Sequence, residues 1–386
     1  MLVAGFRILL AYLIFYAALG AAYPFLPVFY RDLGLALHEI GLLVAVQAAI
    51  MLALAPVWGG LSDRFPRSRA TLPLATAIAT AGATALYLAV GFGAVLIGSL
   101  ILFAGLAGVY PMLDARTLET LGPAARHRFG QVRAFGSLSF VVATLTVGVL
   151  LDAHGPRSLF WVYIPLLALT IVVTSTIPRR GANRSVSLRR GASEILGVPG
   201  VPLFLTGFVV LWAALSGTNA FYSIQLEAVG GSRSLIGLVW AVGAMVEVPI
   251  MYSFPRLAAR FGAERLLVVG GLAFACRAGL SALATDPVML VAIAPLEGIG
   301  FAGTFVGGVT VLAARAPAGT GGTAQGLLTG SAGLATILGS TLGGAIAAAI
   351  GIPGLFVICA IVSVAGSAIV AVAIVRPVRQ AVRPAN

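Results

Sequence analysis

The stretch that decides the fold is residues 59–69, Gly59-Gly60-Leu61-Ser62-Asp63-Arg64-Phe65-Pro66-Arg67-Ser68-Arg69. It carries four charged side chains within seven positions, between long apolar runs at 38–58 and 70–90. Only 9% of the chain is charged, and a charge held in hydrocarbon costs about 2.5–3.5 kcal/mol on insertion scales. We therefore predict a tight, charged turn at a membrane surface, joining two helices that span the bilayer.

The composition of the whole chain indicates a helical membrane protein. The 386 residues are 60% hydrophobic, with a mean hydropathy of +1.05, whereas a soluble protein keeps about a quarter of its residues charged. Apolar runs of about 20 residues, the length that spans a bilayer as a helix, recur from residue 6 to residue 376. The runs are continuous, while the strands of a membrane barrel alternate apolar and polar residues. The predicted class is an all-α integral membrane protein.

Twelve apolar runs are long enough to be spans. We place them at 6–30, 38–58, 70–90, 95–119, 129–151, 158–178, 200–226, 235–255, 265–285, 287–314, 320–350 and 351–376. One hydrophilic stretch divides them into two sets of six, and it is too short to be a domain. The predicted organisation is a six-helix bundle over 1–178, a cytoplasmic linker over 179–198, and a second six-helix bundle with a short cytoplasmic tail over 199–386.

The basic residues predict the orientation in the membrane. All 24 are arginine, and with a cytoplasmic N-terminus 18 of them fall in cytoplasmic segments, 3 on the opposite side and 3 within spans. Cytoplasmic loops carry the excess of basic residues in membrane proteins. We therefore expect a multi-pass protein of the inner (plasma) membrane with both termini in the cytoplasm. Because 21 of the 24 arginines lie between spans, the net charge of +12 indicates no nucleic-acid partner.

The two predicted halves also repeat each other in sequence. Gln131-x4-Gly136-Ser137 begins the fifth span, and Gln325-x4-Gly330-Ser331 begins the eleventh, 194 residues later. The same offset relates the charged turn to a weaker counterpart at 255–262. Internal repeats with a substrate site at their interface are typical of secondary transporters.

With these features the chain resembles the major facilitator superfamily of transporters over essentially its whole length. The loop motif of that superfamily, Gly-x-Leu-Ala-Asp-Arg-x-Gly-Arg-Arg, is matched by Gly59, Leu61, Asp63, Arg64 and Arg67, with Pro66 in place of the second glycine. A narrower resemblance is to the branch with phenylpropionate permeases, nucleoside–proton symporters and relatives of the lactose–proton symporter. It rests on Tyr23-Pro24-Phe25-Leu26-Pro27, Pro111-x-x-Asp114, Phe129-Gly130-Gln131-Val132-Arg133, Glu247-Val248-Pro249, Arg277 and Thr323-Ala324-Gln325-Gly326.

The resemblance implies twelve helices in two pseudo-symmetric bundles and proton-coupled uptake of a small organic solute. It also implies a gating role for Asp63 and Arg64, because the loop aspartate of the superfamily contacts an arginine of the fourth span, here Arg116. The residues themselves predict a nearby ion pair. Asp114 and Arg133 lie at matching depths, near the cytoplasmic ends of the fourth and fifth spans, and we expect a structural or gating role for them.

Three further charges lie near the bilayer midplane. At about 1.5 Å per residue, Glu247, Arg277 and Glu297 reach the middle of the eighth, ninth and tenth spans, and charged residues within spans are by default functional candidates. We interpret the three as a candidate proton-coupling unit. An alternative stays open, in which Glu247 and Arg277 form a permanent buried pair that joins their two helices. Glu297, with no second cation at its depth, is then the favoured coupling acid.

Polar and aromatic residues at middle depth are candidates for lining a substrate cavity. They are Tyr16, Tyr23, Gln47, Tyr110, Asn219 and Gln225. The three histidines lie in loops and the two cysteines lack a metal-binding spacing, so we expect no enzyme, no metal and no cofactor. The expected partners are a small organic solute, protons and the lipid bilayer, for a monomeric protein. The alternatives are a proton-coupled efflux antiporter for drugs or sugars and, in another class, a non-transporting membrane sensor.

Overall fold

The computed structural model describes residues 2–65, 68–121, 129–177, 188–317 and 320–375, which are helical almost throughout. The first half comprises α1 (Leu2–Ala22), α2 (Leu26–Asp32), α3 (Leu37–Arg64), α4 (Thr71–Leu88), α5 (Gly91–Leu121), α6 (Phe129–His154), the short η2 (Pro156–Ser158) and α7 (Leu159–Ser175). The second comprises α8 (Leu188–Leu196), α9 (Val201–Ala228), α10 (Arg233–Phe261), α11 (Ala263–Ala282), α12 (Pro287–Ile293), α13 (Pro295–Phe301), the π-helical η3 (Ala302–Val306), α14 (Gly307–Arg315) and α15 (Gly321–Val375).

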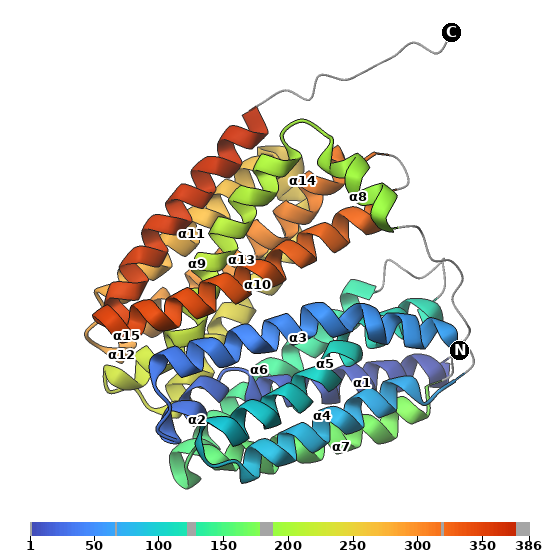
Figure 1. Cartoon of the computed structure of the whole chain (residues 1–386), viewed down its shortest axis with the longest axis vertical. Helices are drawn as coiled ribbons and strands as arrows, with labels where there is room; N and C mark the ends of the chain where they lie inside the picture. Colours follow the sequence, from blue (N-terminus) through green and yellow to red (C-terminus); the bar gives the residue numbers. More distant parts are fainter. Residues whose placement is uncertain (1, 66–67, 122–128, 178–187, 318–319, 376–386) are drawn as a thin grey trace.

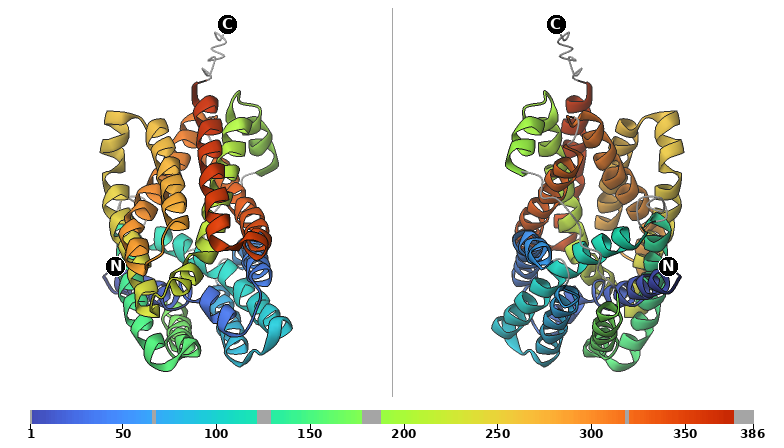
Figure 2. Two further views of the ribbon diagram at one scale, coloured as in Figure 1. Left: turned by 90° about the vertical axis from the view of Figure 1, so that its left-hand side faces the viewer. Right: turned by 90° about the vertical axis from the view of Figure 1, so that its right-hand side faces the viewer.

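The helices form two bundles, one from α1–α7 and one from α9–α15, as the views in Figures 1 and 2 show. Within the described residues, 11 helical segments are long and apolar enough to cross a membrane. The last of them, α15, contains two spans, because Gly351 has a φ of 81° inside it and reverses the chain there. Only glycine adopts this conformation at little cost. The predicted twelve-span architecture is confirmed, including the division between residues 350 and 351.

The main contacts between the two bundles are two helix pairs that the internal repeat relates to each other, and α2 also contacts α9. The second span, α3, packs on the first arm of α15, and α6 packs on α10. A Cβ added to Gly41 would lie 2.7 Å from the Cα of Gly344, and one added to Gly237 would fall on the backbone carbonyl of Thr144. Both contacts lie at the end where α2 ends and α10 begins, which we call the closed end. Toward the opposite, open end the bundles diverge (Figure 1).

The charged stretch that opens the sequence is more helical than predicted. Residues 59–64 continue α3, so the predicted turn over 59–69 is wrong in its first half. The helix ends at Phe65, with φ −118° and ψ 67°, because the residue before a proline is sterically kept out of the helical region and Pro66 follows. The charged residues Asp63 and Arg64 thus do not end α3, whereas Pro66 determines where it ends.

The predicted linker at 179–198 lies partly outside the described residues. Its described part contains α8, which the prediction of a plain linker did not include. Gly191 of this helix lies against Thr323 at the start of α15, since an added Cβ would be 2.8 Å from the Thr323 hydroxyl oxygen. The bounds of the two bundles as domains stay a prediction.

Within each bundle, small residues let helix backbones approach closely. A Cβ at Gly82 of α4 would fall on the backbone nitrogen and Cα of Leu102 of α5, and one at Gly105 would fall on the backbone of Ala79. Close packing through small residues is a main source of helix association in lipid, where burial of apolar surface gives little driving force.

Replacing Gly82 by alanine is therefore expected to destabilise the first bundle by about 1–3 kcal/mol, the usual cost of overpacking. Gly326→Ala is the matched control, because nothing lies within 4 Å of its added Cβ. Thermal unfolding of the two detergent-purified variants measures the effect. Equal melting temperatures for Gly82→Ala and the wild type would contradict the close α4–α5 packing.

Candidate functional site

A cavity of about 500 Å³ lies between the two bundles. Helices of both halves line it, which is the place that an internal repeat predicts for a transport site. Its lining comprises Tyr16, Leu19, Tyr23, Leu26, Pro27, Tyr30, Val44, Gln47, Tyr110, Arg133, Ser137, Phe140, Trp212, Leu215, Ser216, Asn219, Ala220, Trp240, Gly243, Ala244, Glu247, Glu297, Phe301 and Thr336. The site is thus rich in aromatic rings, with a few hydroxyl, amide and charged groups among them.

Five of the six residues predicted to line a cavity do so: Tyr16, Tyr23, Gln47, Tyr110 and Asn219. The sixth, Gln225, is buried and does not line it. Gln225 lies six residues after Asn219 on α9, which turns it by about 240° around a helix of 3.6 residues per turn. Gln225 also lies in the last turn of α9, so both the predicted middle depth and the predicted face of the helix are wrong for this residue.

At the closed end, side chains of both halves form the roof of the cavity. The Trp240 indole N–H donates to the Ser223 hydroxyl over 3.3 Å, and that hydroxyl donates to the Pro24 carbonyl over 2.8 Å. The rings of Tyr23 and Trp240 meet edge to face, with centroids 5.5 Å apart. Sequence reasoning missed Trp240, although its position about two turns before Glu247, on the same face of the same helix, was an available signal.

The two acidic residues of the cavity lie where α10 crosses α13. A Cβ added to Gly298 would lie 2.6 Å from the backbone nitrogen of Glu247, and one added to Gly243 would lie 3.4 Å from the Cβ of Glu297. Glycines at the crossing therefore bring the backbones that carry the two carboxylates close together. Both side chains line the cavity.

Arg277 pairs with Glu297, which rules out the alternative in which it forms a permanent pair with Glu247. The Arg277 Nη1 lies 2.9 Å from Glu297 Oε2, and the guanidinium is stacked over the Tyr222 ring at 4.1 Å. Asn219 completes the group, since it accepts from Arg277 Nη1 over 2.7 Å and donates to Glu297 Oε1 over 3.1 Å. The single cation predicted at this depth therefore belongs to Glu297 and not to Glu247. Residue counting placed all three charges at one depth but did not show that α11 packs on α13.

Glu247 differs from Glu297 in its surroundings. Glu247 forms no ion pair with any described residue, whereas Glu297 has the Arg277 guanidinium at 2.9 Å. Arg277 lies behind the cavity wall, with only 3% of its side chain exposed. The cavity thus holds one carboxylate with a built-in counter-ion and one without.

The predicted Asp114–Arg133 pair is present, with 3.8 Å between Oδ2 and Nη1. Asp114 also accepts a short hydrogen bond from the Tyr12 hydroxyl. Arg133 lines the cavity and leaves 51% of its side chain exposed. It lies one turn from the start of α6, toward the open end. Tyr12 was not predicted, although it stands one helical turn before Tyr16 and therefore shares its face.

Arg116 is buried where α5 passes the charged stretch after α3. Its guanidinium donates to the Arg69 carbonyl over 3.4 Å and to the Thr71 hydroxyl over 3.3 Å. Arg64 is exposed in the last turn of α3. The side chain of Asp63 lies outside the described part of the structure, so its predicted contact with Arg116 stays a prediction.

Comparison with known proteins shows the family. The model of the MFS_1-like family matches residues 6–358. A maltose permease of Geobacillus stearothermophilus is 27% identical over 282 residues, covering 72% of this chain and 70% of its own. A probable 3-phenylpropionic acid transporter of Escherichia coli (strain K12) is 25% identical over 305 residues, with 74% and 76% covered.

A similar fold occurs in the crystal structure of the nucleoside transporter NupG, with a TM-score of 0.87 over 97% of this chain and 100% of that one. The sequences are 16% identical, so this likeness concerns the fold. With a family model over most of its length, two helical bundles and a cavity between them, the chain belongs to the MFS_1-like family and is a multi-pass membrane transporter of small solutes.

Proposed function

We propose that the protein is a proton-coupled symporter for a small organic solute and that Glu247 is the carboxylate that takes up the coupled proton. The observation that carries this proposal is the contrast between the two cavity acids. Glu297 is held by Arg277 and Asn219, whereas no ion pair is recorded for Glu247 among the described residues. Sequence reasoning favoured Glu297 for this role, and the position of Arg277 moves the proposal to Glu247.

An ionised carboxylate in a largely apolar cavity is costly unless it is paired or solvated. Binding a proton removes that cost, so the bundles change conformation around Glu247 most easily when its carboxyl group is neutral. The Arg277 cation already neutralises Glu297, and a proton there would leave the buried guanidinium without its counter-ion. Proton uptake therefore suits Glu247 better than Glu297.

The solute is proposed to be a ring-bearing organic molecule taken up into the cell. Named relatives act on maltose, on 3-phenylpropionic acid as a probable substrate, and on nucleosides. Aromatic faces with a few convergent polar groups are typical of small-molecule sites. Tyr23, Tyr110 and Trp240 offer such faces here, and Gln47 and Asn219 offer amide groups.

Transport is proposed to proceed by rocking of the two bundles around this cavity, with the protein acting as a monomer in the plasma membrane. The excess of arginine assigns both termini to the cytoplasm, so the open end faces the cytoplasm and the closed end faces outward. Proton-coupled efflux of drugs or sugars uses the same architecture and remains the alternative. The direction of proton movement relative to solute movement distinguishes symport from antiport.

Glu247→Gln is expected to abolish solute-driven proton movement while solute exchange continues, because the neutral amide mimics the protonated acid. The measurement uses proteoliposomes with a pH dye and maltose, 3-phenylpropionate and uridine as added solutes. Symport makes the external medium alkaline on solute addition, and antiport acidifies it. Glu264→Gln, at the start of α11 and outside the cavity lining, is the matched control. Full proton movement in Glu247→Gln would refute the assignment.

Glu297→Gln is expected to act mainly on stability. Removing one partner of a buried ion pair costs about 3–5 kcal/mol, because the other charge stays buried. The melting temperature of Glu297→Gln should therefore fall well below that of Glu247→Gln. A double variant that also replaces Arg277 with methionine should recover most of the loss. Equal melting temperatures for the two glutamine variants would contradict the pairing.

Trp240→Ala is expected to weaken solute binding about tenfold, the equivalent of about 1.4 kcal/mol, because the ring that meets Tyr23 at the roof is lost. Trp161→Ala is the control of the same residue type, because this residue of α7 is 53% exposed and does not line the cavity. Thermal stabilisation by the three solutes gives the affinities. If Trp240→Ala binds as tightly as Trp161→Ala, the roof does not contact solute.

A further inference from the structure

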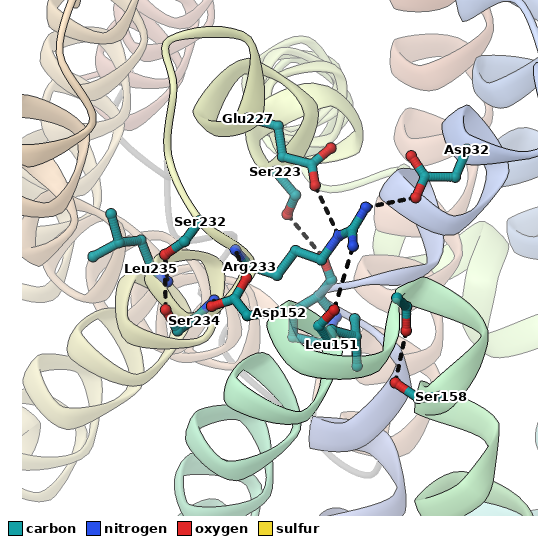
Figure 3. A network of polar contacts seen from close by, with 12 residues as sticks. Asp32, Leu151, Asp152, Ser158, Ser223, Glu227, Ser232, Arg233, Ser234 and Leu235 are labelled. Atoms are coloured by element: carbon teal, nitrogen blue, oxygen red, sulfur yellow. Dashed lines mark hydrogen bonds and ion pairs between the residues drawn. The ribbon is translucent and has the colours of Figure 1, made fainter.

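At the closed end one arginine contacts three helices. Arg233, the first residue of α10, places Nη2 2.6 Å from Asp32 Oδ2 and Nε 3.1 Å from Glu227 Oε1. Its Nη1 also donates to the Leu151 carbonyl over 3.3 Å. Figure 3 shows the guanidinium between the two carboxylates. The three charged side chains are between 22% and 32% exposed, so water screens them only in part.

A second carboxylate of the first bundle binds the backbone of the same turn. Asp152 accepts from the Arg233 amide over 2.7 Å and from the Ser234 amide over 3.0 Å. These amides are free donors at the start of a helix, where a negative charge is stabilised. The end of α6 thus caps the first turn of α10 across the boundary between the bundles. We call Asp32, Leu151, Asp152, Glu227 and Arg233 the Arg233 cluster.

The contacts of the cluster fall into two classes when they are sorted by bundle. Asp32 ends α2 and Asp152 lies in the last turn of α6, so both belong to the first bundle. Glu227 lies in the last turn of α9, in the same bundle as Arg233. Any separation of the bundles at this end breaks the contacts of Arg233 with Asp32 and Asp152. The contact with Glu227 is not broken by such a movement.

We propose that Glu227 is a positioning residue for opening of the closed end, because it keeps Arg233 neutralised once Asp32 has left. In the closed state Asp32 and Glu227 share the Arg233 guanidinium and repel each other. This repulsion acts on Glu227 more strongly than the attraction of Arg31 in α2. In the open state Glu227 is the carboxylate that remains for Arg233. On both grounds Glu227 favours opening, whereas Asp32 and Asp152 favour closure. The proposal rests on the alternating-access motion proposed above and requires neither a particular solute nor proton coupling.

Removing the charge of Asp32 and removing that of Glu227 are expected to change the opening of the closed end in opposite directions, and this difference is the test. In a variant without the native cysteines, Leu26→Cys serves as reporter, since Leu26 lines the cavity near the closed end and is buried. The rate of labelling by a membrane-impermeant maleimide measures opening. Asp32→Asn is expected to raise this rate about two- to fivefold, the range for partly exposed ion pairs. Glu227→Gln is expected to lower it by a similar factor.

Three controls make the result specific. Glu227→Asp keeps the charge and should restore the rate toward that of the parent. Asp286→Asn removes an acid that caps α12 and makes no contact with the cluster, so the rate should not change. Size-exclusion chromatography of each variant establishes that it is folded. If Glu227→Gln labels at the parental rate or faster, Glu227 does not favour opening and the proposal is overturned.

Labelling is measured both in intact cells and in inverted vesicles, without solute or a proton gradient. If the proposed orientation is wrong, the labelled side changes while the opposite signs of the two variants persist. If proton coupling is wrong, these rates are unaffected. If the present proposal alone is wrong, Asp32→Asn and Glu227→Gln will change the labelling rate in the same direction.

Discussion

The structure depends on one constraint, which is that lipid offers no hydrogen-bond partner to a backbone. Every span must therefore be a helix, and the fold is decided by which helices approach closely. Glycines set those approaches, within the bundles at Gly82 and Gly105 and between them at Gly41 and Gly237. The same device brings Glu247 and Glu297 to one crossing of α10 and α13. The packing of the fold and the placement of the cavity acids thus have a common cause.

The charges within the spans follow a second rule, which is pairing. Arg277 has Glu297 and Asn219, and Arg133 has Asp114. Arg116 is buried and donates to backbone and hydroxyl oxygens at the end of the charged stretch. Glu247 departs from this rule in the described structure, and a departure of this kind is the feature that singles out a functional group. The Arg233 cluster applies the pairing rule at the membrane surface, where the contacts divide between the two bundles.

The sequence predicted those features that depend on depth alone. Spans, the division before Gly351, the Asp114–Arg133 pair and five cavity residues follow from counting residues along a helix of known rise. The features that it missed depend on which face of a helix a residue occupies and on which helices pack against each other. Gln225 lies in the last turn of α9 and faces away from the cavity, and Arg277 pairs with Glu297 of α13. Helicity of the charged stretch up to Arg64 was missed because charge indicates where a membrane ends, while only Pro66 indicates where the helix ends.

The reversal at Gly351 has a mechanical consequence. It joins the two arms of α15 without an intervening loop, and both arms lie against neighbouring residues of α9. An added Cβ at Gly339 would fall on the Ala213 carbonyl, and one at Gly366 would lie 2.7 Å from the Leu211 nitrogen. The first arm also contacts α3 across the bundle boundary. Because no loop separates the two arms and both arms pack on α9, we expect a displacement of the first arm at that boundary to move α9 and the second arm with it.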